Sequence, residues 1–223
     1  MGIFDTLGFW NSIFILCSTS LFLISTVIGL VFNFNKRSPL FLQIVTCGSA
    51  CILLGDIYYL SYLNCIGDIP STFYIGDLGT IGGYLFFISA YLALPPKYTK
   101  AKKSKQYNFF VSIITILLVS LMAWAMLYTK VDTPVKVTAV IYFAILIPVF
   151  FLSVKYLLIP LEIEKKWPFK VYNFSVLIFA LRFASYFIFV LIDSPLATIS
   201  YMDLITAIAL IIGSVTIYRG YEK

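Results

Sequence analysis

Two ionisable side chains interrupt long apolar segments of this 223-residue chain. Asp56 lies in the run Leu53-Leu54-Gly55-Asp56-Ile57-Tyr58-Tyr59, and Arg182 lies in the run Phe179-Ala180-Leu181-Arg182-Phe183. A charge at the centre of a bilayer costs at least about 2.5–3.5 kcal/mol, so we expect neither side chain to face lipid. Two interpretations stay open for Asp56 and Arg182: a buried pair that a ligand opens, or a structural pair that fixes helix register.

A second group of acidic and aromatic side chains is expected at the outer ends of the helices. It comprises Asp77, Asp193, Asp203, Tyr58, Tyr59, Tyr62, Tyr74, Tyr84, Tyr186 and Tyr201. Carboxylates beside aromatic faces favour a cation or a cationic amphiphile. Acids also cap helix starts and tyrosines form interfacial belts, so a structural role is the alternative. The predicted ligand-binding residues are therefore Asp56, Arg182, Asp77, Tyr59, Tyr84, Tyr186 and Asp203.

The residue types also limit the chemistry that the chain can perform. The sequence has no histidine, which removes the usual haem ligand, the commonest zinc ligand and the commonest general base. Cys17 and Cys65 are isolated, while Cys47 and Cys51 share one helix face without a third ligand in view, so all four are interpreted as packing residues. No catalytic residue, metal site or cofactor is predicted, and a role other than enzyme is favoured.

The composition indicates which elements must position these residues. The chain is 61% hydrophobic and 12% charged, with a mean hydropathy of +0.98, whereas a soluble domain has roughly 25% charged residues. We therefore predict an all-α membrane protein, in which a single domain over residues 1–223 holds seven transmembrane helices. The predicted spans are 9–34, 40–63, 75–94, 107–127, 135–157, 171–192 and 201–218.

The loop charges predict the orientation. Basic residues follow every odd-numbered span: Lys36, Arg37, Lys97, Lys100, Lys102, Lys103, Lys105, Lys165, Lys166, Lys170, Arg219 and Lys223. The alternate loops hold only Lys130 and Lys136 as basic residues. Because short basic loops stay in the cytoplasm, the N-terminus is predicted outside and the C-terminus inside, in a cell membrane. This pattern explains the net charge of +6 without nucleic acid.

The most basic loop lies between the third and fourth predicted spans. Its lysines are candidates for contact with anionic lipid or with a cytoplasmic partner. They are Lys97, Lys100, Lys102, Lys103 and Lys105.

Two outer loops suggest an internal duplication. Asp68-Ile69-Pro70 precedes Asp77-Leu78, and Asp193-Ser194-Pro195 precedes Asp203-Leu204, with a tyrosine shortly before each second acid. Basic turns that contain proline also precede the second and sixth spans. We predict a parallel repeat of three plus one plus three helices, with halves 9–94 and 135–218 and a linker helix at 107–127. Such a repeat would bring a shared site to the junction of the halves.

The segment Gly55-Asp56-Ile57-Tyr58-Tyr59, followed by Asp77-Leu78-Gly79-Thr80-Ile81-Gly82-Gly83-Tyr84-Leu85, resembles a known family of sensor regions. These are the seven-helix membrane regions that precede some prokaryotic histidine kinases and diguanylate cyclases. The resemblance covers about a fifth of the chain and implies a receptor-like bundle. Microbial rhodopsins share the topology, but residues 201–218 contain no lysine for a retinal Schiff base.

Together these patterns favour a prokaryotic membrane receptor or sensor. We expect it to bind a small cationic or amphiphilic ligand in an outward-facing pocket. One alternative is a transporter of small solutes or ions with the same three-plus-one-plus-three design. The other is a non-catalytic membrane subunit of a larger complex.

Overall fold

The computed structural model describes residues 9–34, 40–67, 73–94, 105–128 and 132–158, with 170, 173–174, 176–178, 180–181 and 208. Its helices are α2 (Phe9–Asn33), α3 (Leu40–Ile66), α4 (Ile75–Leu92), α6 (Lys105–Tyr128) and α7 (Thr133–Leu158). They match the first five predicted helices to within a few residues at each end. The predicted helices 171–192 and 201–218 lie almost wholly outside the described residues.

Four of these helices contain segments long and apolar enough to cross a membrane. The segments are Ile15–Asn33, Leu40–Ile66, Ile75–Leu92 and Lys136–Leu157, and α6 contains a shorter apolar stretch, Phe109–Trp124. On α6, Phe109, Phe110, Ile116 and Leu117 expose 62–65% of their side chains. Apolar side chains exposed around a helix are stable against lipid, so the described part of the chain is that of a helical membrane protein.

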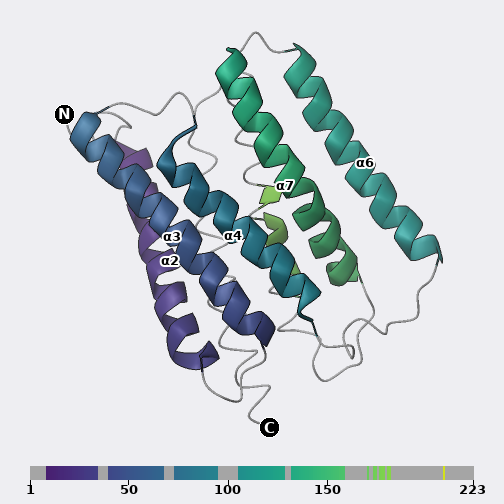
Figure 1. The fold of residues 1–223 in the computed structure, drawn as a ribbon, viewed down its shortest axis with the longest axis horizontal. Coiled ribbons are helices and arrows are strands. Elements are labelled where there is room, and N and C mark those ends of the chain that lie inside the picture. The colour runs from purple at the N-terminus through teal and green to yellow at the C-terminus, as the bar shows by residue number, and fades with distance from the viewer. Residues whose placement is uncertain are drawn as a thin grey trace.

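The helices do not pack in the order in which they follow one another along the chain. Extensive contacts join α2 to α3, α3 to α4, α4 to α7, and α7 to α6 (Figure 1). Helix α7 therefore lies between α4 and α6, and α6 occupies an edge of the described bundle (Figure 1). This order places α4 and α7 side by side in the interior.

Glycines bring α3 and α4 into backbone contact. A Cβ atom at Gly79 would lie 2.7 Å from the carbonyl oxygen of Cys51 and 2.8 Å from the Cα of Gly55. A Cβ at Gly55 would lie 2.7 Å from the carbonyl oxygen of Gly76. Small residues permit this approach, and dispersion between close backbones replaces the hydrophobic effect that lipid cannot supply. The glycines thus fix how α3 and α4 pack.

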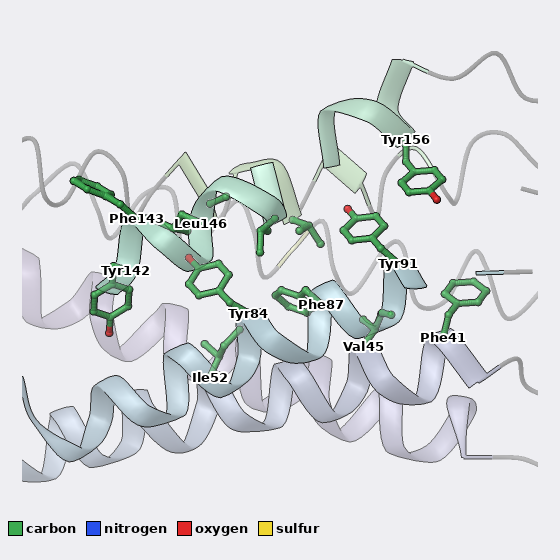
Figure 2. Packing of buried hydrophobic residues seen from close by; sticks show 14 of the residues in the cluster. Phe41, Val45, Ile52, Tyr84, Phe87, Tyr91, Tyr142, Phe143, Leu146 and Tyr156 are labelled. Carbon is green, nitrogen blue, oxygen red and sulfur yellow. The ribbon is translucent and has the colours of Figure 1, made fainter. Parts of the chain in front are cut away.

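The contact between α4 and α7 uses larger side chains at regular spacing. Buried residues on both helices recur at alternating steps of three and four, the spacing of knobs-into-holes packing. They are Thr80, Tyr84, Phe87 and Tyr91 on α4, with Leu94 just beyond its end, and Ala139, Tyr142, Leu146, Val149, Ser153 and Tyr156 on α7. Figure 2 shows Tyr84 between Leu146 of α7 and Ile52 of α3. This seam forms the centre of the described core.

Candidate functional site

Asp77 lies in the first turn of α4, where its carboxylate accepts two hydrogen bonds. Its Oδ2 accepts the backbone N–H of Tyr74 at 2.9 Å, and its Oδ1 accepts the hydroxyl of Tyr142 at 2.5 Å. The first bond satisfies an exposed amide at the helix start, as expected of an acid there. The second bond joins α4 to α7. Asp77 therefore stabilises both the first turn of α4 and the contact between α4 and α7.

Three tyrosines of α3 gather around Tyr74, which precedes α4, and form with it what we call the tyrosine cluster: Tyr58, Tyr59, Tyr62 and Tyr74. The ring of Tyr74 lies 6.1, 6.0 and 6.3 Å, between centroids, from the rings of Tyr58, Tyr59 and Tyr62. All three contacts are tilted, a geometry that aromatic pairs favour over a face-to-face sandwich. Gly76 makes room for this arrangement, because a Cβ there would collide with the Tyr74 ring.

Two further tyrosines, Tyr84 and Tyr91, follow Asp77 at intervals of seven residues along the same face of α4. Tyr84 is fully buried and meets Phe87 edge to face, with centroids 6.5 Å apart and planes at 81°. Tyr91 stacks on Tyr156 of α7, with centroids 5.3 Å apart and planes at 3° (Figure 2). Asp77 to Tyr142 and Tyr91 to Tyr156 are both contacts between α4 and α7, so the two helices run parallel.

The predicted ligand-binding residues divide into those that the structure places and those that it does not. Asp77 lies in the first turn of α4, and Tyr59 lies in the second half of α3. Tyr84 lies deeper in the core, and Asp56 lies half-buried on α3 beside Gly55. The others, Arg182, Tyr186 and Asp203, lie outside the described residues, as does Asp193. The pairing of Asp56 with Arg182 therefore stays a prediction.

The structure describes all four cysteines but only one lysine of the basic loop. Lys97, Lys100, Lys102 and Lys103 lie outside the described residues, and Lys105 begins α6. All four cysteines are free thiols: Cys17 and Cys65 are exposed, while Cys47 and Cys51 are half-buried. Among the residues that the structure describes, no three histidine, cysteine or acidic side chains gather in a way that could hold a metal ion.

Tyr142 is the site residue that sequence reasoning missed. It lies in an apolar helix whose every face is hydrophobic, so its polarity alone does not indicate its partner. A usable signal is its place in the series Tyr142, Val149 and Tyr156, which matches the seven-residue spacing of Asp77, Tyr84 and Tyr91 on α4.

Comparisons of the chain with protein families, with curated proteins and with solved structures find no match.

Proposed function

We propose that this protein is a membrane receptor or sensor that binds a small cationic or cationic amphiphilic ligand at the tyrosine cluster and Asp77. The observation that supports the proposal is the gathering of four tyrosine rings next to a carboxylate at the start of α4. Aromatic faces carry negative electrostatic potential, and a cation within about 6 Å of a ring centroid is attracted to it.

The hydrogen bonds of Asp77 leave its charge available to a ligand. Both donors, the N–H of Tyr74 and the hydroxyl of Tyr142, are neutral groups. They orient the carboxylate without supplying a positive charge. The described helices do not fully enclose the cluster, because Tyr58 exposes 38% of its side chain. A cation at this end of the helices would meet ring faces and a fixed carboxylate together.

The proposal includes the finer architecture predicted from the sequence: seven spans, an outer N-terminus and a three-plus-one-plus-three repeat. Helices α4 and α7, the last of the first half and the first of the second, lie side by side and parallel. Helix α6 lies beyond α7, where a linker helix would stay clear of the junction (Figure 1). Both features support the repeat, and Asp56 with Arg182 would form a second polar contact between the halves.

Binding of alkyltrimethylammonium ions to the purified protein in lipid nanodiscs tests the proposal. The control ligand is the uncharged analogue in which carbon replaces the quaternary nitrogen, because it has the same shape. We expect saturable binding of the cation only. Tyr58→Leu should weaken it by roughly two- to fivefold, the equivalent of one exposed cation–π contact, while Tyr58→Phe retains it. Equal binding of both ligands, or none of the cation, would contradict the proposal.

A transporter built on the same repeat is the second candidate. The observation that favours it is the parallel pair α4 and α7, because a junction between two similar halves is where alternating access places a substrate. Flux of the bound cation into proteoliposomes distinguishes the two functions. Saturable binding with flux indicates a transporter, whereas binding without flux indicates a receptor.

A further inference from the structure

Helix α2 carries a line of polar side chains along its buried face. Ser12, Thr19, Thr26 and Asn33 recur every seven residues and expose 0%, 9%, 5% and 0% of their surface. At a rise of about 1.5 Å per residue, the line extends for ~31 Å, comparable with the roughly 30 Å hydrocarbon thickness of a bilayer. A polar face of this length is unusual in so apolar a helix, whose opposite side exposes Ile24 and Val31.

Most buried serine and threonine hydroxyls on the other described helices are satisfied by their own backbone. Thr46, Ser49 and Thr115 each donate to the carbonyl four residues earlier. In contrast, the hydroxyls of Thr19 and Thr26 have no hydrogen-bond partner among the protein atoms. These two side chains are therefore polar, at least nine-tenths buried, and free to bond to something other than α2.

Asn33 adds a third unsatisfied atom at the end of the line. Its Nδ2 donates to Thr46 Oγ1 at 3.0 Å, and its Oδ1 has no protein partner. The Thr46 hydroxyl already donates its proton to the carbonyl of Leu42, so turning the Asn33 amide over would leave its NH₂ group unpaired instead. Either orientation requires another hydrogen-bonding molecule.

We propose that this face of α2 binds a file of water molecules inside the membrane-embedded part of the protein. Buried polar atoms nearly always have a hydrogen-bond partner, and internal water supplies it where protein atoms do not. Water both donates and accepts, so it fits the hydroxyls of Thr19 and Thr26 as well as the Asn33 amide. Phe22 is fully buried and lies one turn from both Thr19 and Thr26 on the same face, so its ring would separate two parts of the file. This proposal does not depend on a cation site.

Water-edited solid-state NMR on the wild-type protein in lipid bilayers tests the proposal directly. The method measures how fast magnetisation passes from water to each side chain. Thr115 is the matched control, because it is 8% exposed but its hydroxyl is bonded within α6. We expect signals of Thr19 and Thr26 to build up several times faster than those of Thr115. Equal rates for the three threonines would overturn the proposal.

Replacing the hydroxyl by a methyl group provides a second test. In a dry site, Thr→Val removes an unpaired polar group and raises the melting temperature, whereas in a hydrated site it removes a hydrogen bond to water. We expect Thr19→Val and Thr26→Val each to lower the melting temperature by roughly 2–4 °C. Thr115→Val, the same change at a self-satisfied hydroxyl, should leave it near that of the wild type. A higher melting temperature in both α2 variants would overturn the proposal.

Discussion

Asp77 shows how one residue can serve local and long-range structure at once. Its bond to the Tyr74 amide is local, and an acid three residues into a helix makes it predictable from the sequence. Its bond to Tyr142 joins residues 65 positions apart, which no local pattern indicates. The acidic and aromatic character of this site was therefore visible in the sequence, whereas its connection to α7 was not.

The Tyr142 hydroxyl is expected to contribute measurably to stability. Tyr142→Phe keeps the ring in the seam but leaves one oxygen of a half-buried carboxylate without this donor. Hydrogen bonds to charged groups contribute about 1.5–3 kcal/mol, so we expect a loss of that size in the free energy of unfolding. Unfolding in mixed micelles with increasing denaturing detergent measures it. Tyr58→Phe, an exposed tyrosine in the neighbouring cluster, is the control and should change stability little.

At the scale of the helix, the sequence predicts where each helix begins and ends better than it predicts which helices pack against one another. Apolar runs between charged loops marked α2, α3, α4, α6 and α7 because the bilayer sets how long a span must be. The neighbours of each helix are harder to predict, since α3, α4, α6 and α7 are apolar on most sides and lack the narrow apolar stripe that identifies the buried face of a soluble helix. The contact of α4 with α7, rather than with the next helix α6, depends on matched side-chain spacing far apart in the chain.

The glycines of α4 give a prediction about the α3–α4 contact. Gly79→Ala places a methyl group against the backbone of Cys51 and Gly55, which cannot rotate away. We expect the free energy of unfolding to fall by about 1–3 kcal/mol, as in other overpacked sites. Gly82→Ala is the matched control, because its Cβ would lie 3.8 Å from the Cys51 side chain. That variant should be neutral or gain up to about 1 kcal/mol from helix propensity. Equal effects of the two changes would contradict backbone contact.

Phe22 gives a second prediction at this scale, which concerns the polar face of α2. If Phe22 separates two parts of a water file, Phe22→Ala joins them, and vesicles that contain the variant should shrink faster under osmotic stress. Ile24→Ala is the control, since Ile24 is 47% exposed on the opposite side of α2. Stopped-flow light scattering measures the rate. An unchanged rate in a folded Phe22→Ala variant would show that the Phe22 ring does not separate the file.

At the scale of the whole molecule, helix directions can be compared with the loop charges. Parallel α4 and α7 agree with the predicted alternation, in which the third and fifth spans both run inward. Reporter fusions test the absolute orientation. We expect alkaline phosphatase to be active after Gly67, which follows α3, and inactive after Lys223, where green fluorescent protein should fluoresce instead. The opposite pattern at both positions would show that the N-terminus is inside.

The same fusions test why the molecule takes that orientation. The loop between α4 and α6 carries the largest group of lysines, and in a positive-inside mechanism these charges retain it in the cytoplasm. Replacing Lys97, Lys100, Lys102 and Lys103 with glutamine should therefore give a mixed population, with phosphatase activity appearing after Lys223. Replacing Lys130 and Lys136, which lie on the predicted outer side, is the control and should leave the orientation unchanged. If neither set alters the reporter pattern, helix packing rather than loop charge determines the topology.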